Sequence, residues 1–426
     1  MARKNPIFFG WFIVGLMILA MTFAYGIRSS FSAFFPHVLD AYNWDRGVTA
    51  IMFSLNIFVY GLAAPFAGTL VDRWKPRVVV VIGIFVLALS TAACYFAHQL
   101  WQYYLLFGVL APLGTAFCGS PVFNPALMNW FKKRRGLAIG LGQIGGGLSF
   151  VYIMIVEWVN TQWGWQYSFF VMGGLVITVL LPLYLIFYYV RPEDKKMKAY
   201  GEDEVLVKAE AASVATAEPD WTLRSAFRTY QLWLLVFADF CFWGLGNYLV
   251  LAHQIKFAED VGFSSFQAAS AFALFGFVSI GGQITAFISD FIGREKTATI
   301  GVVLSLVGLG ALMSVHDTSQ LWLLYMYSIC GGFGTGLFSP TVIVGSADLF
   351  HGKNIGAISA MVLTGVGFGG AIGPWLGGFI YDLRGSYTIA FFISLVAIAL
   401  AGISYWICAP RHADRLRAKM LKEYKQ

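Results

Sequence analysis

Long apolar stretches separated by short polar loops run through the whole chain. Crossing the hydrocarbon core of a bilayer takes about 20 mostly apolar residues in a helix. Each segment in lipid must satisfy its own backbone hydrogen bonds, so spans of this length are helices. The pattern predicts an all-α membrane protein with transmembrane helices at 8–36, 47–70, 78–97, 102–122, 135–159, 165–190, 230–256, 266–289, 297–315, 320–346, 355–380 and 387–408.

The basic residues collect in alternate loops. Counted loop by loop, 25 of the 29 Lys and Arg residues fall on the side of the two termini. Because cytoplasmic loops are enriched in Lys and Arg, both termini are expected in the cytoplasm of a multi-pass protein. Short termini suit the inner membrane of a bacterial cell. The same distribution explains the net charge of +7 as an orientation signal and argues against a nucleic-acid partner.

Composition agrees with lipid as the natural surroundings. Hydrophobic residues make up 58% of the chain and charged residues 12%, whereas a soluble domain carries about 25% charged residues. The five cysteines lie in or beside apolar segments without paired spacing, so we expect neither a disulfide framework nor a metal site. Membrane lipids are the expected partners, and no cofactor is expected.

The two halves of the chain repeat each other at an offset near 219. Gly114-Thr115 recurs as Gly334-Thr335, and Ser120-Pro121 recurs as Ser339-Pro340. Repeated halves are typical of transporters that rock one half against the other around a central substrate site, and we expect a monomer. The predicted domains are an N-terminal six-helix bundle at 1–190, a cytoplasmic linker at 191–224, and a C-terminal six-helix bundle with a short cytoplasmic tail at 225–426.

One polar loop resembles a motif of the major facilitator superfamily. Residues 68–77 read GTLVDRWKPR, which is similar to the cytoplasmic loop motif G-x-L-x-D-R-x-x-x-R. The resemblance implies twelve helices in two pseudo-symmetric bundles and a latch in which Asp72 faces a helix N-terminus of the other half. An ordinary positively charged loop without a gating role is the alternative. The implied gating residues are Asp72, Arg73 and Arg77, with Asp290 and Arg294 in the echo of the motif after the eighth span.

A second resemblance is to the monocarboxylate transporters and the neighbouring oxalate:formate antiporters. Gly10-Trp11, the stretch 130–147 and the stretch 373–387 carry it. It implies a secondary transporter (a symporter) of small organic anions, often moved with a proton. The family's arginine in the eighth span is replaced here by Gln283, and Arg28 lies next to the position of the lysine that animal members carry in the first span.

Arg28 is the main candidate for substrate contact. A charge inside a span costs roughly 2.5–3.5 kcal/mol by insertion scales, so it normally faces a cavity or a partner. Its distance from the start of the first helix predicts a place toward the outer mouth, where reaching the surface is the competing explanation. The candidate substrate residues are Arg28, Tyr25, Asn247, Gln283, Asn124 and Trp243.

Asp239 is the candidate for proton coupling. Intramembrane carboxyl groups serve as proton relays in transporters, and a hydrogen bond between packed helices is the equally open alternative. Glu157 is expected to be solvated at the outer end of its span, and His253 to lie in the outer vestibule.

Two other functions compete with anion transport. Efflux of hydrophobic drugs or export of a larger metabolite would use the same fold, and the missing arginine favours it. A membrane-embedded enzyme or receptor is a weaker alternative, because the spans hold almost none of the polar clusters that catalysis needs. The chain is therefore expected not to be an enzyme.

Overall fold

The computed structural model describes residues 8–73, 76–202, 221–350, 355–408 and 410–412, without the side chains of 68–69, 71–73 and 135–136. Within these residues it has 12 helices, or runs of helices, long and apolar enough to cross a membrane. The predicted all-α fold with twelve spans is confirmed. The spans are Gly10–Tyr42, Arg46–Ala67, Pro76–Phe96, Leu100–Trp130, Leu137–Trp163, Trp165–Phe187, Tyr230–Val261, Ser265–Ile292, Arg294–Met313, Thr318–Leu349, Ile355–Arg384 and Thr388–Cys408.

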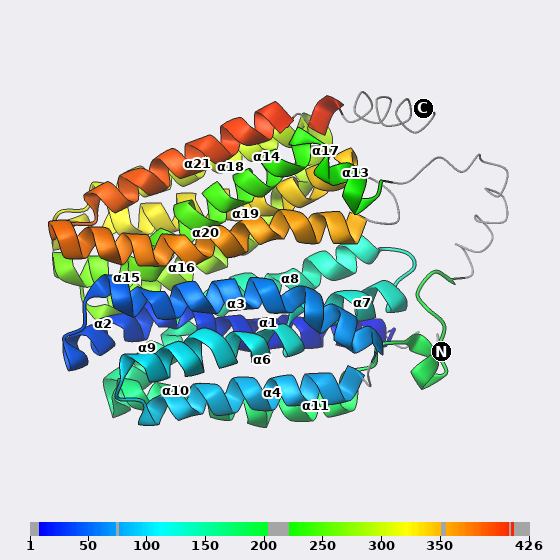
Figure 1. Cartoon of the computed structure of the whole chain (residues 1–426), viewed down its shortest axis with the longest axis horizontal. Helices are drawn as coiled ribbons and strands as arrows, with labels where there is room; N and C mark the ends of the chain where they lie inside the picture. Colours follow the sequence, from blue (N-terminus) through cyan, green and yellow to red (C-terminus); the bar gives the residue numbers. More distant parts are fainter. Residues whose placement is uncertain (1–7, 74–75, 203–220, 351–354, 409, 413–426) are drawn as a thin grey trace, which may run out of the picture.

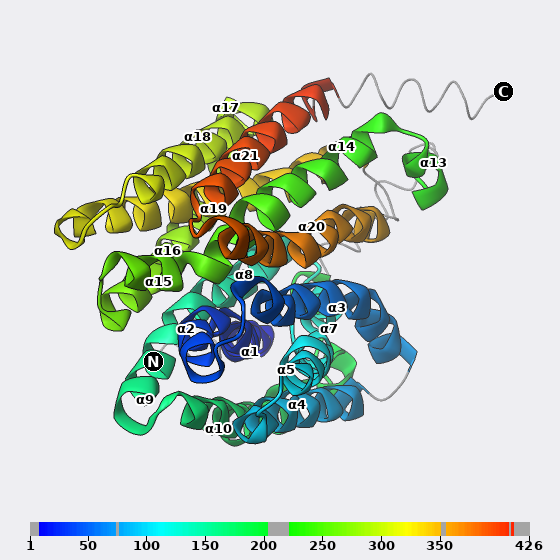
Figure 2. The same cartoon turned by 60° about the vertical axis from the view of Figure 1, so that its left-hand side comes forward.

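The helices lie side by side in two groups that follow the order of the chain (Figures 1 and 2). The first group comprises α1 (Gly10–Ser29), α2 (Phe31–Tyr42), α3 (Arg46–Arg73), α4 (Pro76–Ala93), α5 (Leu100–Tyr103), α6 (Ala111–Cys118), α7 (Ser120–Trp130), α8 (Arg135–Val151), α9 (Ile153–Trp163), α10 (Trp165–Leu175) and α11 (Leu181–Phe187). We call it the first bundle.

The second bundle follows the linker. It comprises α13 (Leu223–Phe227), α14 (Tyr230–Asp239), α15 (Leu249–Val261), α16 (Ser265–Thr285), α17 (Ser289–Ile292), α18 (Arg294–Met313), α19 (Leu321–Leu349), α20 (Ile355–Arg384) and α21 (Thr388–Cys408). The short α13 begins after Thr222, whose side chain accepts a hydrogen bond from the N–H of Ser225.

The first span is longer than predicted, and it is broken. α1 ends at Ser29, and α2 continues from Phe31 to Tyr42. Arg28 therefore has several turns of helix on either side and lies near the middle of the span. The expected place of Arg28 toward the outer mouth stays a prediction, since the length of a helix does not fix the boundaries of the bilayer.

Three spans contain π-helical segments. These are η2 (Tyr104–Leu110), η3 (Val176–Leu180) and η5 (Phe240–Tyr248). Such segments disturb the regular pattern of backbone hydrogen bonds and are frequent at functional sites. Two of them supply backbone carbonyl groups to the site described below.

Glycines allow the helices to pack closely. A Cβ on Gly145 of α8 would lie 2.3 Å from the carbonyl oxygen of Ile18 in α1, and one on Gly365 of α20 would lie 2.1 Å from that of Val236 in α14. Only glycine permits these approaches. These glycines therefore form packing seams at both positions, whereas Gly140 faces open space.

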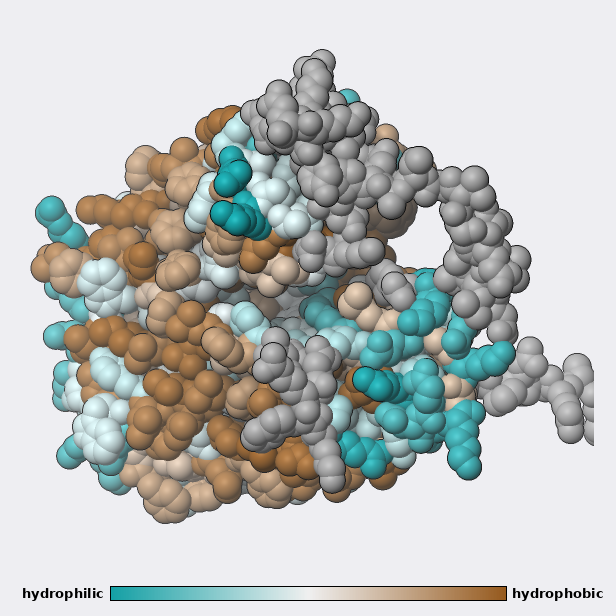
Figure 3. Space-filling model, turned by 45° about the vertical axis from the view of Figure 1, so that its right-hand side comes forward, coloured by the Kyte–Doolittle hydropathy of each residue, from teal (hydrophilic) through white to brown (hydrophobic). Residues whose placement is uncertain are grey.

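The two ends of the molecule differ. We call the end where α1 begins and the linker leaves the first bundle the linker end, and the opposite end the far end (Figure 1). Polar contacts between the bundles gather toward the far end, including an Arg46–Asp260 ion pair at 2.5 Å and a hydrogen bond of 2.5 Å from Ser32 to the carbonyl group of Leu251. At the linker end the surface is hollowed between the bundles (Figure 3).

Candidate functional site

Arg28 is buried in the first bundle, and no counter-ion lies beside it among the residues that the structure describes. Its side chain is 8% exposed, and its Nε donates a hydrogen bond of 2.8 Å to Oδ1 of Asn56 in α3. Nη2 is buried and has no hydrogen-bond partner among the described residues. The described ion pairs do not include Arg28. Nη2 of this guanidinium therefore keeps hydrogen-bonding capacity that the described residues do not use.

Asn56 fixes the orientation of Arg28. Its Nδ2 donates a hydrogen bond of 2.7 Å to the carbonyl group of Phe107, which lies in the π-helical segment η2. Both ends of the amide are thus used, and the Oδ1 that faces Arg28 is held in place. A positioned guanidinium loses less conformational entropy when it binds an anion.

Aromatic rings cover the guanidinium. Its Cζ lies 4.4 Å from the ring centroid of Tyr60 and 5.2 Å from that of Tyr25, so both rings give cation–π contacts. The two hydroxyl groups lie 2.6 Å apart, and the hydroxyl of Ser120 is 3.1 Å from that of Tyr25. Tyr248 of the second bundle is close enough to interact electrostatically with Arg28. The site therefore joins α1, α3 and α7 with η5 of the other bundle.

The second bundle repeats parts of this arrangement. Nε1 of Trp243 donates a hydrogen bond of 3.0 Å to Ser339, as Tyr25 contacts Ser120 at the equivalent repeat position. Asn247 is the repeat partner of Arg28. Its Nδ2 donates to the carbonyl group of Phe242, at 2.7 Å, within the π-helical segment η5. Its Oδ1 accepts from Thr335 at 3.2 Å.

The remaining predicted substrate residues are placed differently. Asn124 follows Ser120 by one helical turn on α7, so both point to the same side, and its Oδ1 is buried without a hydrogen-bond partner among the described residues. Gln283 is half-buried on α16, beside the close contact of Gly282 with α19. Within the described residues, no hydrogen bond joins Gln283 to the Arg28 cluster.

Asp239 ends α14 and is 4% exposed. It lies eight residues before Asn247 in the same span, or about 12 Å at the rise of an α-helix. The neighbouring carbonyl groups of Val236 and Phe240 lie against Gly365 and Gly369 of α20. The carboxyl group is thus held at membrane depth between the Arg28 level and the linker end.

The predicted gating residues lie at the linker end. The side chains of Asp72 and Arg73 are outside the described residues. Arg77 donates a hydrogen bond of 3.2 Å from Nε to the carbonyl group of Tyr188, within the first bundle. Arg294 pairs with Asp290 at 2.5 Å and with Asp348 at 2.9 Å, within the second bundle. In this conformation Arg77 and Arg294 each contact their own bundle.

Two minor expectations are wrong. Glu157 is 1% exposed and accepts a hydrogen bond of 3.2 Å from Asn160. It is therefore buried, because α9 packs against α16 of the other bundle. His253 is fully buried, with its Nε2 2.8 Å from the carbonyl oxygen of Pro374, so it does not lie in an open vestibule.

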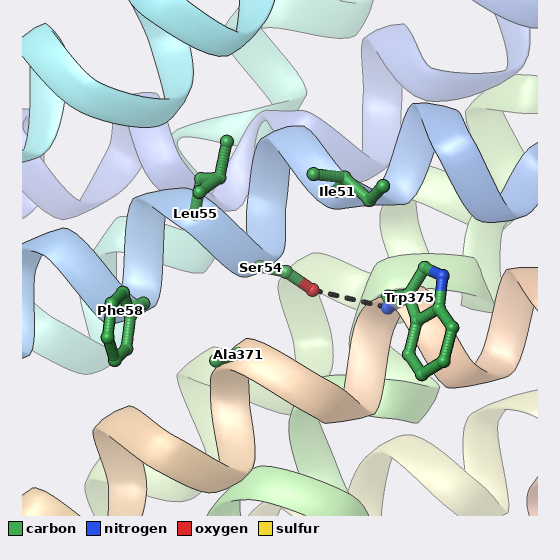
Figure 4. A pocket seen from close by; sticks show the side chains of 6 residues that line it. All are labelled: Ile51, Ser54, Leu55, Phe58, Ala371 and Trp375. Carbon is green, nitrogen blue, oxygen red and sulfur yellow. Dashed lines mark hydrogen bonds between the residues drawn. The ribbon is translucent and has the colours of Figure 1, made fainter.

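A groove between α3 and α20 is separate from the Arg28 site. It measures about 220 Å³. On α3 its lining residues form the helix face roughly opposite Asn56 and Tyr60, as follows from 100° of rotation per residue. Ser54 accepts a hydrogen bond of 3.2 Å from the N–H of Trp375 there (Figure 4). The lining residues are Ile51, Ser54, Leu55, Phe58, Ala371 and Trp375.

Sequence reasoning missed three residues of the site. Asn56 and Tyr60 are one turn apart on α3, and Ser120 belongs to a Ser-Pro dipeptide that the sequence marks only as part of the repeat. An amide side chain within an apolar span, followed four residues later by a tyrosine, is a usable signal of a polar helix face.

Twelve membrane-spanning helices in two groups, with a buried cation at membrane depth, are typical of a polytopic membrane transporter. The comparisons with known proteins agree. A sequence model of the Major Facilitator Superfamily matches residues 17–288 and 256–423. The chain belongs to the Major Facilitator Superfamily.

Individual relatives are distant. Monocarboxylate transporter 11 of Homo sapiens is 25% identical over 416 residues, covering 94% of this chain and 83% of that protein. The uncharacterized MFS-type transporter YcxA of Bacillus subtilis (strain 168) is 23% identical over 429 residues, covering 96% of this chain and 97% of that protein. A crystal structure of a bacterial homolog to the human lysosomal transporter Spinster, inward-facing and occupied, superimposes with a TM-score of 0.72 at 14% identity, covering 96% of this chain and 98% of that chain. That likeness shows the fold.

Proposed function

We propose that this transporter moves a small organic anion, similar to a monocarboxylate, by alternating access and together with a proton. The observation that carries the proposal is the buried guanidinium of Arg28, which has an unpartnered Nη2 and no ion pair among the described residues. A charge at membrane depth is costly unless it is paired. A substrate anion would supply the missing partner.

The geometry favours a carboxylate. Nε of Arg28 is already engaged by Asn56, and Nη2 has no partner among the described residues, so a bound anion would approach the Nη side. Guanidinium and carboxylate groups match in a bidentate arrangement, and charge-assisted hydrogen bonds of this kind are about twice as strong as neutral ones. A single positioned guanidinium with aromatic neighbours suits one carboxylate on a small organic body.

Alternating access is supported by the difference between the two ends. The far end holds polar contacts between the bundles, and the linker end is hollowed (Figure 3). With the linker end in the cytoplasm of a bacterial inner membrane, as the basic loops predict, this conformation faces inward. We expect the chain to act as a monomer.

The orientation is tested by labelling two exposed positions. Lys196 lies at the linker end and Arg384 at the far end, and both are exposed. In cells, a membrane-impermeant maleimide is expected to label Arg384→Cys and to leave Lys196→Cys unlabelled until the membrane is permeabilised, since the basic loops are cytoplasmic. Labelling of both positions from outside would contradict the topology.

The substrate class is tested with purified protein. Small monocarboxylates are expected to raise the melting temperature in a concentration-dependent manner, because a ligand that binds only the folded state stabilises it. The corresponding amides are matched controls that lack the charge. The bound acids should then enter proteoliposomes that contain the protein. Stabilisation by amides and acids alike would contradict recognition of a carboxylate.

Efflux of a hydrophobic drug or a larger metabolite is the second candidate. The aromatic rings of Tyr25, Tyr60 and Trp243 near the site favour it. Stabilisation by hydrophobic cations and resistance of cells that express the protein would support this candidate, although a hydrophobic cation would meet repulsion from Arg28.

A further inference from the structure

The first turn of α3 is capped by a residue of the other bundle. The N–H of Arg46 donates a hydrogen bond of 2.9 Å to Oδ1 of Asp382, and the N–H of Gly47 donates one of 2.7 Å to Oδ2. The first N–H groups of a helix have no partner within the helix, and a carboxylate there also interacts favourably with the helix dipole. Here the cap comes from α20, at the far end.

Close backbone contact allows this cap. A Cβ on Gly378 of α20 would lie 2.6 Å from the carbonyl carbon and oxygen of Arg46, and one on Gly47 would lie 2.9 Å from the backbone nitrogen of Phe379. Both helices therefore need glycine where they cross. The carboxylate reaches the helix end only when α20 lies directly against α3.

The Arg46 side chain adds to the same contact. Its Nη1 lies 2.5 Å from Oδ2 of Asp260 and donates a hydrogen bond of 2.8 Å to the hydroxyl of Tyr387. Its Cζ lies 3.6 Å from the ring centroid of Tyr381. The hydroxyl of Tyr387 is 3.2 Å from Nδ1 of the buried His253. The backbone and side chain at the start of α3 are thus both bound to the second bundle.

We propose that Asp382 is a gating residue, whose carboxylate caps α3 only while the far end is closed. The proposal rests on the proposed alternating access. When α20 moves away from α3 at this end, the two hydrogen bonds from the N–H groups to the carboxylate break. The cap therefore favours the conformation in which the far end is closed. Asp382 acts on transport through the equilibrium between conformations and does not touch the substrate.

The arrangement has a counterpart in the sequence. α3 and α20 run in opposite directions, since α3 begins at the far end and α20 ends there. Asp72 lies near the end of α3, as Asp382 lies near the end of α20. The sequence predicts that Asp72 faces a helix N-terminus of the other half at the linker end. A transporter that closes one end at a time would form one cap in each state.

The equilibrium can be measured without any substrate. Spin labels would be placed on the exposed far-end pair Gln99→Cys and Thr318→Cys, and on the exposed linker-end pair Lys132→Cys and Lys296→Cys, after replacement of the five native cysteines. With Asp382→Asn, the fraction with a long far-end distance is expected to rise about fivefold, as for the loss of one carboxylate cap at a helix N-terminus. The linker-end distance should shorten in the same fraction.

Two variants control this experiment. Arg384→Gln removes a charge two residues away, at the exposed end of the same helix, and is expected to leave both distances unchanged. Asp382→Glu keeps the carboxylate and is expected to restore part of the closed far end. Unchanged distances in Asp382→Asn would overturn the proposal for Asp382, whereas the proposed transport function is decided separately by uptake of small acids.

Discussion

Replacement of Arg28 by glutamine is expected to abolish uptake of the anionic substrate while the protein still folds and inserts. Two charge-assisted hydrogen bonds to the carboxylate would be lost, each worth about 1.5–3 kcal/mol. Since about 1.4 kcal/mol corresponds to a factor of ten, affinity should fall about a hundredfold or more. Insertion should not suffer, because removing a buried charge removes a cost of roughly 2.5–3.5 kcal/mol. Uptake and thermal shift measure both effects.

Matched variants separate the charge from its placement. Arg28→Lys keeps the charge without the fork of two Nη groups and is expected to give intermediate affinity. Asn56→Ala keeps the guanidinium and removes its hydrogen-bond partner, so binding should weaken less than in Arg28→Gln. Arg384→Gln, on the exposed far end, should bind normally. Normal uptake by Arg28→Gln would show that Arg28 is structural.

Replacement of Asp239 by asparagine is expected to remove the dependence of uptake on a proton gradient. In the wild type, uptake should rise as the outside becomes more acidic than the inside, because the proton moves with the anion. The amide side chain of the variant cannot take up a proton. Only the exchange of one anion for another across the membrane should therefore remain. Initial uptake rates into proteoliposomes, measured at fixed internal pH and falling external pH, test this.

The same variant distinguishes the two roles that the sequence left open for Asp239. Asparagine resembles the protonated carboxyl group in size and hydrogen bonding, so a merely structural Asp239 predicts an unchanged pH profile. Asp317→Asn is the control, at an exposed position outside the spans. The hydroxyl and the N–H of Ser319 donate to Asp317 and hold its pKa below the usual value. Asp317 is therefore not expected to take up a proton over the pH range of the uptake assay. The Asp317→Asn variant should keep the wild-type dependence of uptake on pH.

The two bundles use amide side chains in a similar way near the site. Asn56 and Asn247 each donate to a carbonyl group in a π-helical segment, in η2 and η5 respectively. The first bundle presents a cation near this level, and the second presents an amide at the repeat position.

The amino-acid sequence by itself determined the number of spans and the repeat of the two halves. These features follow from a one-dimensional rule, since every segment in lipid must be long, apolar and internally hydrogen-bonded. Arg28 and Asp239 were also recognisable from the sequence as candidate functional residues, because any charge in such a segment is costly.

Only the tertiary structure decided what those charges contact. The place of Arg28 within its span depends on α2 continuing that span to Tyr42, and its partner Asn56 is 28 residues away. The cap on Arg46 comes from Asp382, which is 336 residues away. Hydropathy tells which segments are apolar enough to lie in lipid. Contacts between helices depend on how each helix is rotated about its axis and packed against its neighbours, and the order of apolar residues does not encode this.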